Sequence, residues 1–152
     1  MIGGGLELAS ATHIRIADKT AFYQLPEGRR GIFVGGGASV RIGRILGADR
    51  MIEMMLTGRK YDAEEGLRLG FSHYVCDSED DAKEKAAELA TTVAENAQLS
   101  NYVMIQALAR IEDMSKADGL FTESLCAALT QTSEDAQEGL RAFLEKRAPS
   151  FK

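Results

Sequence analysis

Residues 3–9 are Gly3-Gly4-Gly5-Leu6-Glu7-Leu8-Ala9, and residues 25–28 are Leu25-Pro26-Glu27-Gly28. Each stretch places a glutamate beside a glycine-rich turn. Two carboxylates can divide general acid and general base catalysis between them if the fold brings both to one substrate. A glycine-rich turn that opens a helix also presents N–H groups and the positive end of the helix dipole to a developing oxyanion. The pattern therefore indicates chemistry on a polarised carbonyl.

Hydrophobic periodicity around these stretches predicts short alternating elements followed by a helical region. The glycine turn at Gly35-Gly36-Gly37 is expected to open a helix that ends at Gly47. Other helices are expected at residues 6–12, 48–56, 62–69, 79–96, 102–111, 121–129 and 136–144, and strands at 13–17, 21–24 and 71–76.

Two local patterns refine this prediction. Asp62 and Glu65 have the spacing of a capping box, which starts a helix. The helix at 48–56 is expected to bury Ile52, Met55 and Leu56, while the methionine cluster at 51, 54 and 55 is interpreted as adaptable packing rather than a binding surface.

The chain resembles the crotonase (enoyl-CoA hydratase/isomerase) superfamily. The motifs that carry the resemblance lie in family order at family spacing and cover nearly the whole chain. They are Gly3 to Ala9, His13 to Ala17, Ala21-Phe22 through Pro26-Glu27, Gly31, Gly35-Gly36-Gly37, Met54 to Arg59, Asp62 to Gly66, and Glu138 to Arg147.

The resemblance implies an α/β fold, the crotonase-like ββα spiral, followed by a C-terminal helical region. Residues 1–78 would form the C-terminal portion of the spiral core, and residues 79–152 the helical region that covers the active site and mediates oligomerisation. Family members have a β-α core upstream of the glycine turn, so we expect the chain to be the C-terminal part of such an enzyme. On its own it should be oligomeric or aggregation-prone, without appreciable hydratase activity.

The resemblance also implies a function, the hydration of a 2-enoyl-CoA thioester. Glu7 and Glu27 would hold one water molecule between them, and the Gly4 N–H would donate to the thioester oxygen beside Gly3. Coenzyme A is then part of the substrate, with no further cofactor and no metal. The alternatives are a hydroxycinnamoyl-CoA hydratase-lyase, an enoyl-CoA isomerase, and an inactive truncated fragment that acts only in assembly.

Four further residues are candidates for contact with the substrate. Gly35 matches a glycine that borders the acyl pocket, although Val34 stands where proline is usual. Tyr23 could border a bulky acyl group, but aromatic residues at strand ends are more often core. Phe143 and Lys146 match positions that touch the CoA adenine and phosphate, often from a neighbouring subunit. Alternatively, Phe143 belongs to the helix core and Lys146 complements the helix C-terminus.

Composition limits the classes of protein to which the chain can belong. The 152 residues have 45% hydrophobic and 27% charged side chains, as in ordinary globular proteins. A net charge of -5 argues against nucleic-acid binding, and no apolar run approaches the roughly 20 residues of a membrane-spanning helix. Cys76 and Cys126 suggest neither a disulfide framework nor a metal site. We expect a cytoplasmic homo-oligomer, a trimer or hexamer by resemblance, whose partner is an acyl-CoA thioester.

Overall fold

The computed structural model describes residues 1–151, and the chain divides into two compact units. The first is Met1–Ala87 and the second begins at Glu88. This division falls inside helix α5 (Glu79–Ala94), whereas the sequence predicts a domain boundary before it, between residues 78 and 79.

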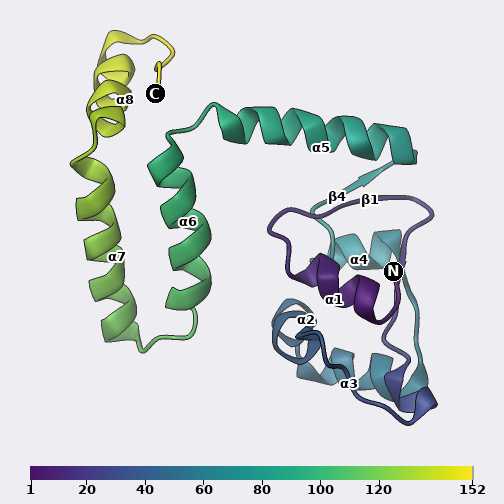
Figure 1. Ribbon diagram of the computed structural model, residues 1–152. Coiled ribbons are helices and arrows are strands. Elements are labelled where there is room, and N and C mark those ends of the chain that lie inside the picture. The colour runs from purple at the N-terminus through teal and green to yellow at the C-terminus, as the bar shows by residue number, and fades with distance from the viewer. Residues whose placement is uncertain (152) are drawn as a thin grey trace. The chain divides into compact units, whose positions relative to one another are not determined.

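The first unit contains short helices and short strands (Figure 1). Strand β1 (Ile16–Asp18) pairs in parallel with β4 (Tyr74–Cys76), with Ile16 opposite Tyr74, and β2 (Phe22–Tyr23) pairs antiparallel with β3 (Tyr61–Asp62). Its elements before α5 are α1 (Gly4–Ser10), β1 (Ile16–Asp18), β2 (Phe22–Tyr23), the 3-10 helix η1 (Glu27–Arg30), α2 (Ala38–Leu46), α3 (Ala48–Thr57), β3 (Tyr61–Asp62), α4 (Ala63–Arg68) and β4 (Tyr74–Cys76).

Glycines and a capping box determine where the middle helices begin and end. Gly37 precedes α2 with a φ of 94°, and Gly58 ends α3 in the left-handed conformation with a φ of 69°, which favours glycine at both positions. At α4, the Asp62 side chain accepts from the Glu65 amide and the Glu65 side chain accepts from the Asp62 amide, as the sequence predicts.

All three predicted strands are shorter than expected, and in two of them nearby polar groups bind part of the predicted segment. The strand expected at 13–17 begins at Ile16, since the Arg15 amide donates to Nδ1 of His73 at 3.1 Å. The strand expected at 71–76 begins at Tyr74, since the Phe71 amide donates to the Gly66 carbonyl at 2.8 Å and closes the end of α4.

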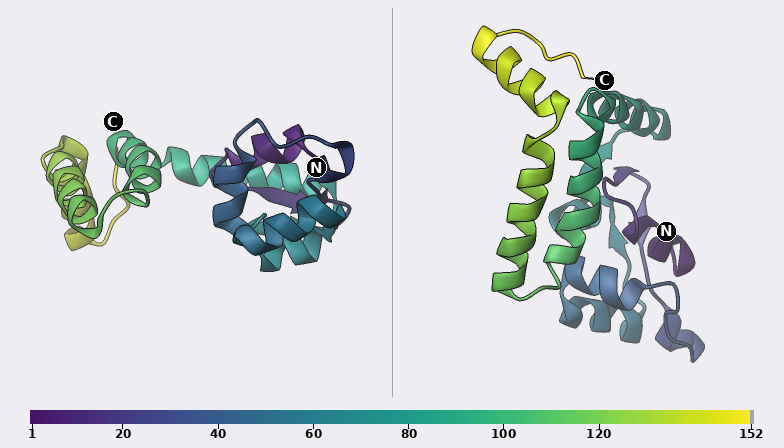
Figure 2. Two further views of the ribbon diagram at one scale, coloured as in Figure 1. Left: turned by 90° about the horizontal axis from the view of Figure 1, so that it is seen from below. Right: turned by 60° about the vertical axis from the view of Figure 1, so that its left-hand side comes forward.

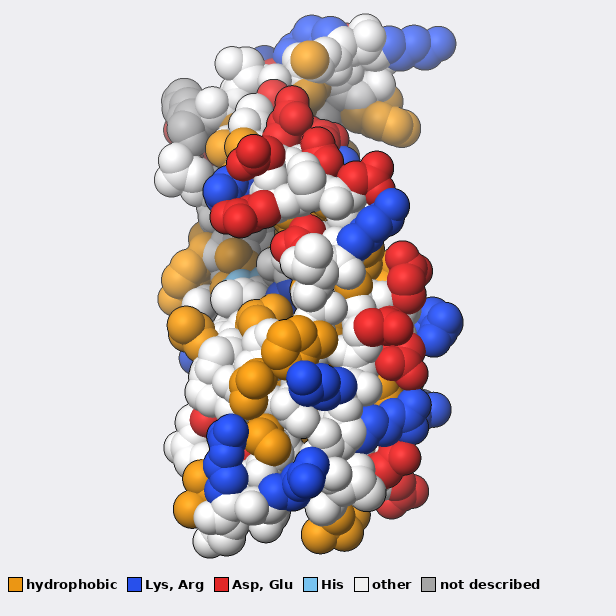
Figure 3. Space-filling view, turned by 90° about the vertical axis from the view of Figure 1, so that its right-hand side faces the viewer, with side chains coloured by type: hydrophobic (Ala, Val, Ile, Leu, Met, Phe, Trp, Pro, Cys, Tyr) orange, Lys and Arg blue, Asp and Glu red, His pale blue; other side chains and the backbone are white. Residues whose placement is uncertain are grey.

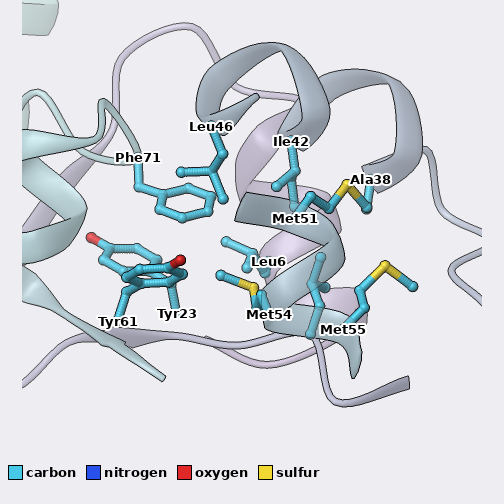
Figure 4. Packing of buried hydrophobic residues seen from close by; sticks show 11 residues of the cluster. Leu6, Tyr23, Ala38, Ile42, Leu46, Met51, Met54, Met55, Tyr61 and Phe71 are labelled. Atoms are coloured by element: carbon cyan, nitrogen blue, oxygen red, sulfur yellow. The ribbon is translucent and has the colours of Figure 1, made fainter. Parts of the chain in front are cut away.

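A hydrophobic core fills the first unit (Figure 4). The Tyr23 and Phe71 rings stack with centroids 4.8 Å apart. The other members are Leu6, Leu25, Ala38, Ile42, Leu46, Met51, Met54, Met55 and Tyr61. This core joins α1, α2 and α3, so it fixes the positions of the two glycine turns that precede α1 and α2.

Helix α3 faces the core with a different side from the one predicted. Its buried residues are Met51, Met54 and Met55, whereas Ile52 and Leu56 are 53% and 71% exposed. Both sets repeat at i, i+3 and i+4 and share Met55, so periodicity alone does not distinguish them. The methionine side packs with Leu6 and Ile42, which confirms the packing role predicted for the cluster.

The second unit is helical. Its helices after α5 are α6 (Gln98–Ile111), α7 (Lys116–Gln131) and α8 (Glu134–Glu145), and Ser115 and Ser133 cap α7 and α8 with their side chains. Helices α6 and α7 lie side by side in Figures 1 and 2.

Large apolar side chains remain exposed in both units, and Figure 3 shows one face on which hydrophobic patches alternate with charged side chains. In the second unit, side chains on the predicted apolar faces are largely exposed. Leu108, Phe121 and Leu125 are 65%, 66% and 55% exposed.

Candidate active site

The first glycine turn forms the start of α1. Gly3 precedes the helix with a φ of 51°, a conformation that L side chains rarely adopt. Its carbonyl accepts the amides of Leu6 and Glu7 at 2.9 and 3.0 Å. Gly4 is the first helical residue, and the structure records no acceptor for its N–H among residues 1–151. The turn therefore holds an available backbone donor beside a glycine that the backbone conformation requires.

The Glu7 carboxylate is fixed by the second glycine turn. Its Oε1 accepts the Gly36 amide at 2.7 Å and lies 3.4 Å from the Ala38 amide. A Cβ atom at Gly36 would lie 2.7 Å from Oε2 of Glu7, so this approach requires glycine. The bond joins α1 to the turn before α2, across 29 residues of sequence. It leaves the Glu7 side chain half-buried in a defined orientation.

Glu27 is buried, with 6% of its surface exposed. Its Oε2 has no hydrogen-bond partner among the described residues. Its Oε1 lies 3.2 Å from the position that a Cβ atom would take on Gly3. A buried carboxylate oxygen without a partner is costly, and such groups are usually satisfied by water or by a ligand. Glu27 therefore offers a free acceptor immediately beside the first glycine turn.

The fold thus brings four sequence-predicted residues to one place: Gly3, Gly4, Glu7 and Glu27 share the start of α1 or contact it. Two carboxylates and a free backbone donor are the groups needed to exchange protons with a substrate while a carbonyl oxygen gains charge. Gly35 is exposed in the turn that holds Glu7, and nothing lies within 4 Å of its Cβ position, so this position is open.

Tyr23 lies in the core instead of at a substrate surface. It is 1% exposed, it stacks on Phe71, and its ring fills the place of a side chain at Gly66. Burial raises the pKa of its hydroxyl, while the neighbouring Ser72 and Arg15 lower it. The expected contact with an acyl group finds no support in this position, because the packed core covers the ring. The structure assigns Tyr23 the alternative role that sequence analysis kept open.

Phe143 and Lys146 lie at the end of α8. Phe143 is 80% exposed, so the alternative that it belongs to the helix core does not hold in this chain. The buried residue of this turn is Ala142, which is 1% exposed. Lys146 ends the helix with a φ of 55°, the left-handed conformation. Both side chains are accessible in this chain.

Sequence reasoning missed the partner of Glu7. It assigned the exposed N–H groups to the first glycine turn, but the Gly36 and Ala38 amides of the second turn hold the carboxylate. The available signal was that three consecutive glycines precede a helix, where first-turn amides have no partners within the helix.

The described residues contain neither a candidate metal site nor a candidate membrane-spanning helix. Across residues 1–151, no group of three or more His, Cys, Asp or Glu side chains could hold a metal ion. Among the described helices, none has the length and apolar character needed to cross a membrane.

Comparison with known proteins gave consistent matches. A family model described as enoyl-CoA hydratase/isomerase matches residues 1–152. The probable enoyl-CoA hydratase of Bacillus subtilis is 37% identical over 151 residues, with 99% of this chain and 58% of that protein covered. Probable enoyl-CoA hydratase 2, mitochondrial, of Arabidopsis thaliana is 35% identical over 150 residues, with 99% and 50% covered.

Solved structures agree with the sequence matches. The enoyl-CoA hydratase from Bacillus anthracis superposes with a TM-score of 0.94 at 32% identity, covering 99% of this chain and 58% of that chain. A Rhodopseudomonas palustris protein assigned to the enoyl-CoA hydratases superposes with a TM-score of 0.90 at 52% identity, covering 95% and 56%. The expected crotonase fold is confirmed. The chain spans about half to three fifths of the length of its relatives.

Proposed function

Because this chain belongs to the enoyl-CoA hydratase/isomerase family, we propose that it carries the acid–base residues of an enoyl-CoA hydratase. The reaction is the addition of water across the 2,3 double bond of a 2-enoyl-CoA thioester. Coenzyme A is part of the substrate, and the reaction needs no metal or redox cofactor.

The proposed mechanism places one water molecule between Glu7 and Glu27. The water oxygen forms a bond to the β-carbon, one carboxylate takes the proton that the water loses, and the double-bond electrons move onto the thioester as an enolate. The other carboxyl group delivers a proton to the α-carbon, and the product is a 3-hydroxyacyl-CoA. Donation from the Gly4 N–H to the thioester oxygen would stabilise the enolate.

The proposal rests on the burial of Glu27 and on the unpaired oxygen of its carboxylate. Its carboxylate is buried, one oxygen has no partner among the described residues, and the other lies beside the turn that begins the helix of Glu7. A water molecule donating to Oε2 would satisfy the orphaned oxygen. The bond from Gly36 to Glu7 leaves Glu7 oriented instead of free in solvent.

The second unit would supply contacts to coenzyme A and to other subunits. We assign Phe143 and Lys146 to the adenine and phosphate of CoA, within a homo-oligomer that is a trimer or hexamer. Their exposure supports this assignment, as do the exposed Leu140 and Leu144, which are 65% and 79% accessible on the same helix. Light scattering coupled to size-exclusion chromatography measures the assembly state. The cytoplasmic location stays a prediction.

The test is turnover of crotonyl-CoA by the protein in its native, active assembly, because the chain on its own is expected to lack appreciable hydratase activity. Glu7→Gln and Glu27→Gln should each lower the turnover number by at least ~10²-fold, since each removes a positioned acid or base. Binding of the CoA ester should change little, because Gln preserves the shape. Glu64→Gln is the matched control, as Glu64 is an exposed residue of α4, and its turnover should equal that of the wild type.

Product analysis completes the test. A hydratase gives the 3-hydroxyacyl-CoA, an isomerase gives the 3-enoyl-CoA, and a hydratase-lyase cleaves a hydroxycinnamoyl-type CoA to an aldehyde.

Near wild-type turnover in either glutamate variant would contradict the paired-carboxylate mechanism.

A further inference from the structure

Arg41 of α2 joins the two backbone segments that hold Glu7. Its Nη2 donates to the Glu7 carbonyl at 3.2 Å and also to the Gly36 carbonyl. Its Nε donates to Oγ of Ser10 at 3.2 Å. Ser10 is 7% exposed, and its hydroxyl donates in turn to the Glu7 carbonyl at 2.7 Å. The guanidinium therefore sits where α1 meets the second glycine turn.

These bonds and the carboxylate bond act on the same pair of residues. Glu7 and Gly36 are joined once by the Gly36 amide on Oε1 of Glu7, and a second time by Arg41, which binds the carbonyls of both. Loss of the second link would let the turn move relative to α1. The hydrogen bond from the Gly36 amide to Oε1 of Glu7 would then no longer keep its present length and direction.

The turn is shaped to admit the arginine. A Cβ atom at Gly37 would collide with the Arg41 guanidinium, and Gly37 also has a φ of 94°. Glycine at position 37 thus meets a conformational and a steric requirement together. Arg41 is the only side chain among residues 1–151 that the described hydrogen bonds connect to both the Glu7 and Gly36 carbonyls.

We propose that Arg41 is a positioning residue for Glu7, holding the carboxylate in the orientation required for proton transfer. This inference rests on the proposed hydratase function for its catalytic consequence, but the positioning itself is independent of turnover. A planar guanidinium holds several N–H donors on different nitrogens in one fixed geometry, whereas the three donors of a lysine ammonium group lie on a single nitrogen. Arg41→Lys should therefore preserve the position of the Glu7 carboxylate only in part.

The first measurement is hydrogen exchange of the Gly36 amide by NMR in the full chain. Glu7→Ala removes the acceptor and defines the unprotected rate. Arg41→Met should bring the Gly36 exchange rate most of the way to that limit, and Arg41→Lys should lie between. The amide of Gly58, which donates to Met54 at the end of α3, should be unchanged and reports on the rest of the unit. Arg68→Met removes an exposed arginine on α4 and should leave Gly36 protected.

The second measurement is turnover in a double-mutant cycle. Arg41→Met should lower the turnover number by about ten- to a hundred-fold, with little change in KM, as expected when a catalytic group is misplaced by about 1 Å. In the Glu7→Gln background, Arg41→Met should cost almost nothing further. A residue that only stabilises the fold would lower turnover equally in both backgrounds.

The two measurements separate the possible failures. Wild-type exchange at Gly36 in Arg41→Met, or in Glu7→Ala, would overturn the positioning role whatever the activity. Should Arg41→Met not fold, wild-type Gly36 exchange in Arg41→Lys would equally overturn it. Normal positioning effects in an active assembly that forms a product other than the 3-hydroxyacyl-CoA would instead reject the proposed function and retain the structural role of Arg41.

Discussion

The amide nitrogen of Gly36 lies 2.7 Å from Oε1 of Glu7, and a Cβ atom at Gly36 would lie equally close to Oε2 of that carboxylate. Position 36 must therefore donate a hydrogen bond and carry no side chain. Gly36 has no positive φ, so steric contact with Glu7, and not backbone conformation, makes glycine necessary.

Gly36→Ala tests this relationship. The methyl group should push the Glu7 carboxylate off the amide and lower turnover by at least about ten-fold, since a displacement near 1 Å can cost about 10²-fold. The fold should survive, because Glu7 is half-buried and can rotate away. Steady-state kinetics and thermal unfolding are the measurements.

Gly43→Ala is the control for this prediction. Gly43 lies within α2, and its nearest neighbour would be the Met51 sulfur at an ordinary 3.8 Å. Alanine should raise stability by roughly 1 kcal/mol and leave turnover unchanged. Equal turnover in Gly36→Ala and Gly43→Ala would show that the Glu7–Gly36 contact has no catalytic role.

Gly4→Pro tests the backbone donor of the first turn. Proline is well tolerated at the first position of a helix, and nothing lies within 4 Å of the Gly4 Cβ position, so the variant should fold. Loss of the N–H should cost roughly 2.7–4 kcal/mol of transition-state stabilisation.

Gly4→Ala retains the N–H but adds a methyl group. It therefore separates the effect of hydrogen-bond donation from the effect of steric space at residue 4. Turnover lost in Gly4→Pro and retained in Gly4→Ala would assign the effect to the donor. A folded Gly4→Pro protein with the wild-type rate would mean that Gly4 acts only in the turn.

Local chemistry explains what could be predicted from the sequence. The capping box at Asp62 and Glu65 and the helix ends at Gly47 and Gly58 depend on adjacent residues, and each was expected. The approach of Glu27 to the first glycine turn was expected from family resemblance, not from local rules.

Contacts between residues distant in the sequence explain the features that could not be predicted. The bond between Glu7 and Gly36 depends on how α1 packs on α2, which no local pattern encodes. Tyr23 sits in a short strand where either side could be buried, and contact with Phe71 and Gly66 decides the outcome. Phe143 keeps helical spacing but remains exposed, because spacing predicts an apolar face without specifying what covers it.

Tyr23→Phe tests the core position of this ring. The Tyr23 hydroxyl is buried without a hydrogen-bond partner among the described residues, although Ser72 lies nearby. Removing an unsatisfied buried hydroxyl should leave stability unchanged or raise it by about 1 kcal/mol. The ratio of specificity constants for crotonyl-CoA and a cinnamoyl-type CoA should not change. A shifted ratio would return Tyr23 to the acyl pocket.

The end of α8 should respond to acid through Glu138. Arg147 donates to both carboxylate oxygens of Glu138, at 2.6 and 3.0 Å, and the Ser150 amide donates at 3.1 Å. These bonds, led by that with Arg147, lower the pKa of Glu138 from 4.5 to about 2. A carboxyl whose pKa is lower when folded stabilises the fold above its unfolded pKa, and that contribution disappears as the pH falls.

Protection of the Ser150 amide should therefore decline between pH 4.5 and about 2. The effect is local and modest, because the ion pair is at the surface. Hydrogen exchange across this range, expressed as protection relative to an unstructured peptide, measures it. Glu138→Gln should have lower protection at neutral pH and no decline in the acid range. A decline of equal size in Glu138→Gln would assign the acid response to another group.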